Sequence, residues 1–428
     1  MKEHDMDDNN MDDDATRLGR FRGFTPNQDQ ESSDDTDETR LGALPHIGRS
    51  NTTVPTQPLG QSPVPRADAQ RTAHRHPLIP TEHPRRGQSP ASTPTRQQRA
   101  PRPAEVRGPA SDASITRFGE VFNAIVDNVS EAVIGKEHTI RQCVTALMAG
   151  GHVLLEDNPG TGKTQLARAI ANSIESPFKR IQFTPDLLPG DVVGVTFYDQ
   201  QTGAFTFRKG PVFAATVLAD EINRASPKTQ SALLEVMEEQ KVTVDGVTHD
   251  VPQPFMVIAT QNPIEQLGTY RLPEAQLDRF LIKTSLGDPG HEASLSILRE
   301  ARVRDRAATV RPVTTGADVL AMRAIAETVH VDDAILEYVV RLVEATRHND
   351  RIAVGSSIRG ALALVRSARV WAAADSRSYV VPADVKELAS AVLAHRVILT
   401  PEATFAGDTA DSVIASVLDD VVAPTIGA

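Results

Sequence analysis

Cysteine is nearly absent from this sequence of 428 residues, because Cys143 is the only one. A single thiol forms no intramolecular disulfide and cannot supply a cysteine-rich zinc site. The 12 histidines are scattered without the spacing of metal ligands, which argues against a histidine-based metal site. We therefore expect Cys143 to be a buried structural thiol.

Long apolar runs are also missing from the chain. No stretch approaches the roughly 20 consecutive apolar residues that a membrane-spanning helix needs. The first residues, MKEHDMDDNNMDDD, lack the basic and then apolar layout of a signal peptide. The sequence therefore predicts a soluble, cytoplasmic protein without membrane insertion.

The chain also lacks an overall excess of basic charge. Its formal net charge is -11, whereas a nucleic-acid-binding protein usually presents a basic face that displaces counterions. This balance argues against nucleic acid as a partner.

The first quarter of the chain lacks the patterned apolar residues of a folded domain. Residues 1–40 carry 13 acidic and 5 basic side chains, whereas residues 41–110 carry 10 arginines, 3 acids and 13 prolines. Proline removes backbone donors and favours extended conformations, and such a composition leaves little apolar surface to bury. We predict a disordered tail over residues 1–113, acidic at first and then rich in Pro and Arg. It could act as a docking arm open to phosphorylation or as a solubilising tether.

Beyond residue 113, short apolar runs alternate with helix-like segments. An apolar stripe at helical spacing from Ile115 to Val129 predicts a helix that leads into the folded part. Four short apolar runs follow, at residues 152–156, 180–184, 215–220 and 255–262. Such runs are typical of parallel strands buried on both faces of an α/β sheet. Because the later pattern is helical only, we predict an α/β domain over residues 114–288 and a helical domain over residues 289–428.

The first chemical motif is DNPGTGKT, which directly follows the run HVLLE. Gly160 and Gly162 allow the backbone to curl so that its amides point at phosphate oxygens, and the next helix presents its positive dipole end. Lys163 would reach the β- and γ-phosphates, and the Thr164 hydroxyl would coordinate the bridging Mg²⁺. The strict P-loop (Walker A) pattern has glycine where this chain has Asp157. The predicted ATP-binding residues are Asn158, Pro159, Gly160, Thr161, Gly162, Lys163, Thr164 and Gln165.

Two further motifs supply groups for hydrolysis. The run ATVLAD ends 57 residues after Lys163 at Asp220, which is followed by Glu221 in a Walker B arrangement. A carboxylate at the end of a strand neighbouring the P-loop can hold magnesium, and Glu221 can polarise the attacking water. Asn262 closes the run FMVIATQN, and its neutral amide can orient that water without adding negative charge. The alternatives are an acidic turn for the first pair and an ordinary turn residue before Pro263 for Asn262.

Taken together, these motifs resemble those of the MoxR branch of the AAA+ ATPases across most of residues 115–400. The likeness also rests on FTPDLLPGDVVG, FRKGPVF, ADEINRASPKTQSALLEVMEE, GTYRLPEAQLDRF and VGSSIRGALAL. It implies a P-loop AAA+ core with a parallel sheet, a helical lid domain, and ATP with Mg²⁺ as cofactors. It further implies a homo-oligomeric ring, usually a hexamer, with ATP at each subunit interface. The family commonly has proline where this chain has Arg271 and Ile358.

The resemblance also implies roles for two arginines. Arg279, in LDRF, would be an arginine finger that reaches into a neighbouring subunit and stabilises charge on the transferred phosphoryl group. Arg359 would be a second sensor that contacts the γ-phosphate of its own subunit. Without the resemblance, Arg359 would be interpreted as a solvated arginine at the start of a helix.

Two predicted hairpins interrupt the α/β pattern. VVGVTFYDQQTGAFTF turns around residues 200–203, and VTVDGVTHDV turns at residues 245–246. In the resembling family such insertions lie near the central face of the ring, where substrate is contacted. Phe197, Tyr198 and Phe205 are therefore candidates for substrate contact, although they could equally well serve only to pack their hairpin.

The residues and the resemblance together predict an ATPase ring that acts as a chaperone-like remodelling or maturation factor. The resemblance implies a partner that bears a von Willebrand factor A domain, while the client protein is not identified by the sequence. One alternative is a nucleotide-gated scaffold with little turnover. Another is a DNA-remodelling AAA+ motor, although the sequence lacks an evident DNA-binding module.

Overall fold

The structure is a computed structural model, and it describes residues 111–263, 269–299 and 305–425. The predicted disordered tail over residues 1–113 lies outside the described residues except for its last three. Its end was predicted too late, because Ser111 caps α1 (Asp112–Ala132) and residues 112 and 113 lie in this helix. The Ser111 side chain caps this helix by accepting a hydrogen bond from the Ser114 amide. The predicted apolar stripe is confirmed as the buried face of α1.

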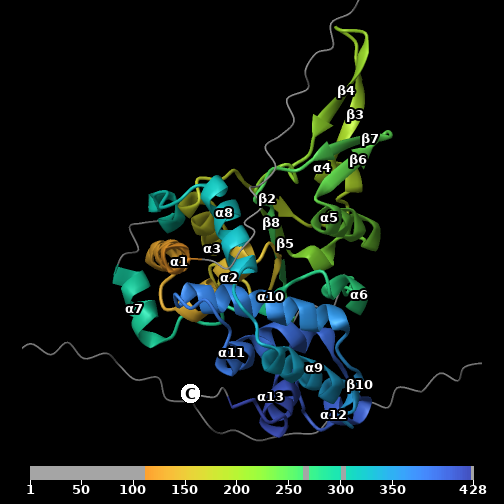
Figure 1. Cartoon of the computed structure of the whole chain (residues 1–428). Coiled ribbons are helices and arrows are strands. Elements are labelled where there is room, and N and C mark those ends of the chain that lie inside the picture. The colour runs from red at the N-terminus through yellow and green to blue at the C-terminus, as the bar shows by residue number, and fades with distance from the viewer. Residues whose placement is uncertain (1–110, 264–268, 300–304, 426–428) are drawn as a thin grey trace, which may run out of the picture. The chain divides into compact units, whose positions relative to one another are not determined.

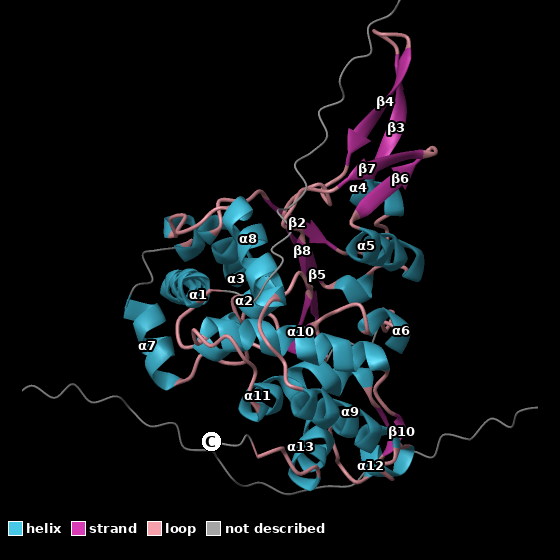
Figure 2. Cartoon of the chain, viewed as in Figure 1, coloured by secondary structure: helices cyan, strands magenta, loops and turns pink. Residues whose placement is uncertain are grey.

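A five-stranded parallel sheet with the order β2-β5-β8-β1-β9 forms the centre of the α/β region (Figure 2). Its strands are β1 (Val153–Glu156), β2 (Phe178–Gln182), β5 (Thr216–Asp220), β8 (Met256–Gln261) and β9 (Ile282–Thr284). The four predicted apolar runs are confirmed as β1, β2, β5 and β8. The strand that ends at Asp220 was expected to neighbour the P-loop strand, and this expectation is wrong, because β8 lies between β5 and β1.

The strands β1, β5 and β8 are buried on both faces, as expected for parallel strands. This expectation is wrong for β2, which lies at the edge of the sheet and exposes Lys179, Arg180 and Gln182. Successive side chains of a strand point to opposite faces, so Val153 and Leu155 pack in one hydrophobic cluster while Leu154 packs in the other. The first cluster joins that face of the sheet to the helices α1, α2 (Glu137–Met148) and α3 (Lys163–Ser173). The second cluster covers the other face with α4 (Pro189–Val193) and α5 (Pro227–Glu239), among others.

The short helix α6 (Glu274–Leu277) lies between β8 and β9, and the region after the sheet is mostly helical. Its helices are α7 (His291–Arg299), α8 (Gly316–Glu327), α9 (Asp333–Arg347), α10 (Ile358–Ala374), α11 (Pro382–Leu393), α12 (Pro401–Phe405) and α13 (Ala410–Asp420). The prediction of helices alone is wrong in one detail, because β10 (Ile352–Val354) and β11 (Ile398–Leu399) form a short antiparallel pair. Both strands are too short to leave an alternating pattern. In the described part of the chain, no helix combines the length and the apolar character needed to cross a membrane.

Two hairpins extend from the α/β region, as predicted (Figure 1). One pairs β3 (Gly194–Asp199) with β4 (Ala204–Lys209), and the other pairs β6 (Lys241–Val244) with β7 (Val247–Asp250). The second turns through Asp245 and Gly246, whose φ values of 50° and 76° are those of the tight hairpin turn predicted from this dipeptide.

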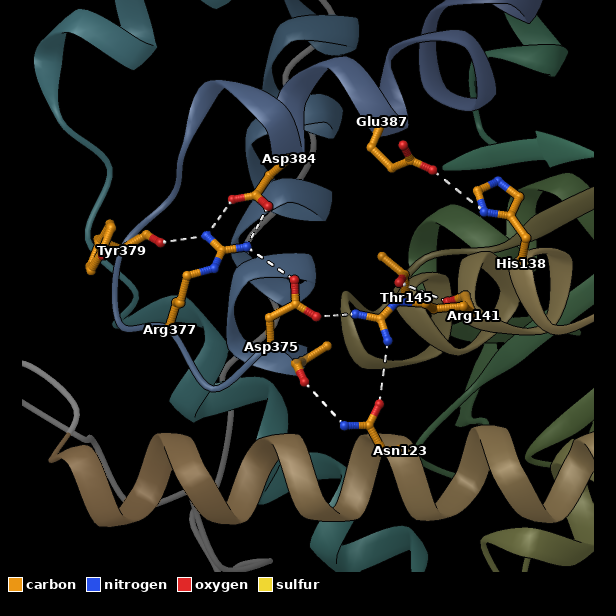
Figure 3. A network of polar contacts seen from close by, with 10 residues as sticks. Asn123, His138, Arg141, Thr145, Asp375, Arg377, Tyr379, Asp384 and Glu387 are labelled. Carbon is orange, nitrogen blue, oxygen red and sulfur yellow. Dashed lines mark hydrogen bonds and ion pairs between the residues drawn. The ribbon is translucent and has the colours of Figure 1, made fainter. Parts of the chain in front are cut away.

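A chain of charged side chains fixes the helical region to α2 (Figure 3). Arg141 of α2 pairs with one oxygen of Asp375, just after α10, and its guanidinium lies 4.7 Å from the ring centre of Trp371. The other oxygen of Asp375 lies 3.2 Å from Arg377, which donates to both oxygens of Asp384 at 2.6 and 2.8 Å. Hydrogen bonding to Asp384 raises the pKa of Arg377, so its guanidinium remains charged.

Candidate functional site

The loop between β1 and α3 has the geometry of a phosphate cradle. Gly160 and Gly162 have φ values of 88° and 98°, which residues with a side chain rarely adopt. A Cβ atom at either position would meet no atom within 4 Å, so the loop leaves open space for phosphate oxygens. The Lys163 ammonium donates to the carbonyl oxygens of Asp157 and Asn158 at 2.8 and 3.0 Å. The cation is therefore held at the loop.

Asp157, the departure from the strict P-loop pattern, anchors the loop to the strands beside it. Its buried carboxylate accepts hydrogen bonds from the amides of Leu286 and Gly287 at 2.8 and 2.7 Å, just after β9. Its own amide donates to Gln261 of β8. Burial, and secondarily the charge of Asp157, raises the pKa of Cys143 to about 12. The prediction of a buried thiol at Cys143 is confirmed, and this thiol is unreactive at neutral pH.

The other predicted ATP-binding residues lie on the loop or in the first turn of α3. The Thr161 hydroxyl is 3.4 Å from the Asn158 carbonyl, and Thr164 is half-buried beside Lys163. The Gln165 side chain accepts a hydrogen bond of 2.8 Å from the Ala307 amide, so it also fastens α3 to the segment that follows α7.

Asp220 is held from two neighbouring strands. One oxygen of its carboxylate accepts from the Thr260 hydroxyl of β8 at 2.6 Å. The other accepts from Arg180 of β2, whose Nη2 and Nε lie at 2.6 and 3.1 Å. The Thr260 hydroxyl also accepts from the amide of Glu221 at 2.9 Å. The carboxyl ends of β2, β5 and β8 are thereby tied together.

The carboxylate of Glu221 lies at the surface of this edge. Its backbone is left-handed, with φ 56° and ψ 50°, a conformation that is rare for residues other than glycine. One of its oxygens accepts from Gln182 at 2.7 Å and lies 3.2 Å from Arg224. These contacts fix the direction of the carboxylate.

Asn262 directly follows β8 and is buried. Because β8 lies between β5 and β1, the acidic pair, Asn262 and the P-loop all follow the carboxyl ends of three adjacent parallel strands. The structure thus brings Lys163, Asp220, Glu221 and Asn262 to one edge of the sheet. Such an edge is where ligands bind in open α/β sheets.

The residues at this edge fit a magnesium ion that is bound together with a nucleotide. Among the residues that the structure describes, no three His, Cys, Asp or Glu side chains are grouped closely enough to hold a metal by themselves. Magnesium is usually bound by one or two protein oxygens together with substrate phosphates. Thr164 and Asp220 are suitable donors of this kind.

Arg279 and Arg359 lie together around a different carboxylate. Glu238, near the end of α5, is 2.7 Å from Arg279 through one oxygen and 3.2 Å from Arg359 through the other. Arg359 also lies 3.6 Å from Asp278, which accepts a hydrogen bond of 2.7 Å from the buried Arg396. The side chain of Arg359 is 56% exposed. It stands at the start of α10, as the sequence indicated.

A cavity of about 970 Å³ opens beside this cluster, between the end of α5 and the helices α9 and α10. Arg366 and Arg369 continue the line of Arg359 along α10, and Leu336 and Val340 form part of the apolar wall. Burial lowers the pKa of Arg366. The cavity therefore combines cations with apolar surface.

The hairpin aromatics proposed for substrate contact pack on each other and remain exposed. Tyr198 and Phe205 are cross-strand partners with ring centres 5.3 Å apart, yet they are 54% and 78% exposed. Phe197 is exposed as well. Phe207 of β4 stacks on His249 of β7 with ring centres 4.4 Å apart. This contact joins the two hairpins, which lie side by side in Figure 1.

Sequence reasoning missed Arg180, Gln182, Glu238 and Thr260. All four stand in stretches that the sequence analysis quoted or predicted as strands, yet each contacts a residue that is distant in the sequence. The one available signal concerned Thr260, which lies two residues before Asn262 and hence on the same side of an extended strand.

Comparisons with known proteins match the same regions. Residues 152–282 match the model of the ATPase family associated with various cellular activities (AAA), and residues 344–417 match that of the AAA lid domain. Chaperone MoxR1 of Mycobacterium tuberculosis is 38% identical over 335 residues, which cover 76% of this chain and 88% of that protein. Protein MoxR of Methylorubrum extorquens is 31% identical over 316 residues, which cover 68% and 91%.

Two further relatives are similar over most of their length. Protein YeaC of Bacillus subtilis, which is described as uncharacterized, is 47% identical over 299 residues, or 70% of this chain and 93% of that protein. A crystal structure from Cytophaga hutchinsonii, of a protein provisionally assigned as an ATPase, superposes with a TM-score of 0.69 at 38% identity. That match covers 73% of this chain and 98% of the other.

Proposed function

Because the chain belongs to the MoxR branch of the AAA+ ATPases, we propose that it hydrolyses ATP with magnesium as a ring and thereby remodels or matures partner proteins. The observation that carries this proposal is the edge of the sheet where the P-loop, Asp220, Glu221 and Asn262 meet.

Each group at this edge has a chemical task in hydrolysis. The loop amides and Lys163 would hold the β- and γ-phosphates. Thr164 and Asp220 would hold magnesium, which when bound neutralises charge on the phosphates. Glu221 would accept the proton of the attacking water as its oxygen bonds to the γ-phosphorus and the bond to the β-γ bridging oxygen breaks, with Asn262 orienting that water.

The arginine cluster supports a site that is shared between subunits. Arg279 and Arg359 share Glu238, and Arg359 is largely exposed. If Arg279 reaches a neighbour's phosphate, Arg359 lies close enough to serve the same phosphate. We therefore propose that Arg359 acts on the neighbouring subunit. The resemblance instead implies that it acts on its own subunit, and mixed rings can distinguish the two assignments.

The first test is steady-state ATP hydrolysis at increasing protein concentration, in wild type, Glu221→Gln and Arg279→Ala, at one magnesium concentration. Specific activity is expected to rise with concentration because the site is completed by a neighbour. Both variants should lose turnover while still binding a fluorescent ATP analogue. Turnover that survives the loss of Arg279 would disprove the shared site, and a wild type that binds but never hydrolyses would favour the scaffold alternative.

The proposed action on proteins rests on the relatives, one of which is named Chaperone MoxR1. A partner with a von Willebrand factor A domain is part of the proposal by resemblance. The exposed aromatic pair Tyr198 and Phe205 is the proposed contact surface for an extended client segment.

A further inference from the structure

Thr260 stands where the strand of Asn262 meets the strand of the acidic pair. It is fully buried, and its neighbours across the sheet are Leu155 of the P-loop strand and the end of β5. We propose that Thr260 is a positioning residue whose hydroxyl sets both the Asp220 carboxylate and the Glu221 backbone relative to Asn262. This inference rests on the proposed ATPase function and names a further residue that the reaction needs.

The directions of the two hydrogen bonds are fixed by chemistry. The Glu221 amide can only donate, so the Thr260 hydroxyl accepts that bond of 2.9 Å with a lone pair. Its single proton is then free for the Asp220 oxygen at 2.6 Å. No other rotation of the hydroxyl satisfies both the Glu221 amide and the Asp220 carboxylate, so one hydroxyl holds these two groups together.

The strained backbone of Glu221 makes this support necessary. A left-handed residue with a side chain persists only where its surroundings fix it, and Glu221 has φ 56°. The bond from its amide to Thr260 contributes to this fixation of the backbone, while Gln182 and Arg224 hold the carboxylate.

The position of Thr260 links this support to the nucleotide. Thr260 and Asn262 are two residues apart, so their side chains lie on the same side of an extended backbone. Thr260 therefore connects the acidic pair to the strand that ends directly before Asn262. Arg180 is less suited to this role, because its side chain is 49% exposed and contacts only Asp220 of the acidic pair.

The test compares Thr260→Val, which removes the hydroxyl at nearly constant volume, with Thr260→Ser, which keeps it. Thr216→Val is the matched control, because Thr216 is a fully buried threonine at the opposite end of β5. Two quantities are measured: kcat and KM for ATP, and the magnesium concentration for half-maximal binding of a fluorescent ATP analogue. Circular dichroism checks that each variant is folded.

Thr260→Val should lower kcat by about tenfold or more, since it removes the partner of a partly buried amide and of a buried carboxylate oxygen. KM and magnesium-free nucleotide binding should stay nearly unchanged, while the magnesium requirement rises. Thr260→Ser should restore most of kcat, and Thr216→Val should resemble wild type. If Thr260→Val does not fold, Thr260→Cys gives a second test, because a thiol is a weak donor.

The two possible failures are distinguishable. If wild type hydrolyses ATP and Thr260→Val keeps both its kcat and its magnesium requirement, the positioning role is wrong. It is also wrong if the serine variant is as impaired as the valine variant, because the methyl group would then be what matters. If wild type shows no hydrolysis, the proposed function fails, and the magnesium dependence of analogue binding still tests Thr260.

Discussion

At the scale of single residues, Asp157 illustrates how the loop depends on a side chain outside the usual pattern. Replacing it with glycine would restore the strict motif yet leave the buried amide of Leu286 and the partly buried amide of Gly287 without their acceptor. Such a loss costs about 1–3 kcal/mol per unpaired group. We expect Asp157→Gly to lower the free energy of unfolding and to weaken nucleotide binding.

Urea unfolding and titration with a fluorescent ATP analogue measure these two effects of the Asp157 substitution. Asp157→Asn, which keeps one acceptor oxygen, is the control and should lie between the variant and wild type. A glycine variant at least as stable as wild type would show that the two bonds contribute nothing.

His152, just before β1, is a second residue whose role depends on hydrogen-bond direction. The Val257 amide can only donate, so Nδ1 of His152 accepts that bond of 3.0 Å and Nε2 must carry the proton that it donates to the Met237 carbonyl at 3.0 Å. Burial lowers the pKa of His152 from 6.5 to about 4. The folded protein therefore keeps this ring neutral.

Stability should decrease in acid for this reason. Between pH 6.5 and about 4 the unfolded chain binds the proton and the folded chain does not, so stability is full above this window and falls as the pH is lowered through it. A pKa difference of this size corresponds to about 3 kcal/mol.

Urea unfolding of wild type and His152→Gln from pH 7 to 4 measures the contribution of His152. The free energy of unfolding of wild type should exceed that of His152→Gln by less at the lower pH. The buried His395, whose pKa burial also lowers, acts equally in both proteins. If the free energies of unfolding of the two proteins change with pH in parallel, His152 does not make the expected contribution.

At the scale of secondary-structure elements, the ion pair of Arg141 and Asp375 is expected to couple α2 to the end of α10. Arg141 is mostly buried and also lies over the Trp371 ring, whereas Asp375 is 43% exposed, so solvent weakens the pair. A double-mutant cycle with alanine should give a coupling of about 0.5–1 kcal/mol that decreases with salt.

A cycle on Arg341 and Glu337 of α9 is the matched control, because these side chains are 4.0 Å apart and more exposed. Its coupling should be close to zero. Equal couplings for the two pairs would show that the network in Figure 3 adds no specific connection between α2 and the helical region.

The elements also show what the sequence could and could not predict. Apolar runs predicted four strands of the sheet, because buried parallel strands carry a strong local pattern. β9, β10 and β11 have two or three residues each and leave no such pattern. The apolar runs also placed the P-loop, Asp220, Glu221 and Asn262 at strand ends, where the structure has them, while their roles in hydrolysis stay predictions. The strand order, and with it the contacts of Thr260 and Arg180, depends on pairing between distant segments that periodicity does not encode.

At the scale of the whole molecule, mixed rings can assign each arginine to a subunit. Lys163→Ala removes the nucleotide site of its own chain and leaves both arginines intact. Mixed with Arg279→Ala, it should regain part of the wild-type activity, because the intact P-loop of one chain meets the intact arginine of the other. If Arg359 serves the neighbour, Lys163→Ala mixed with Arg359→Ala should recover activity as well.

The measurement is ATP hydrolysis by each variant alone and by the two mixtures. The inactive control is a ring in which every chain carries Lys163→Ala. Recovery with Arg279→Ala but not with Arg359→Ala would show that Arg359 acts within its own subunit. Recovery in neither mixture would contradict a site completed in trans.

The first hydrophobic cluster has a mechanical consequence. It runs without interruption from one face of the sheet through α1 and α2 to α9, α10, α11 and α13. Hinging the helices away from the sheet would expose this apolar surface to water, at about 25 cal/mol for every Å² uncovered. We therefore expect each chain to move as one rigid body, so that in the proposed ring the movements driven by ATP would occur between subunits.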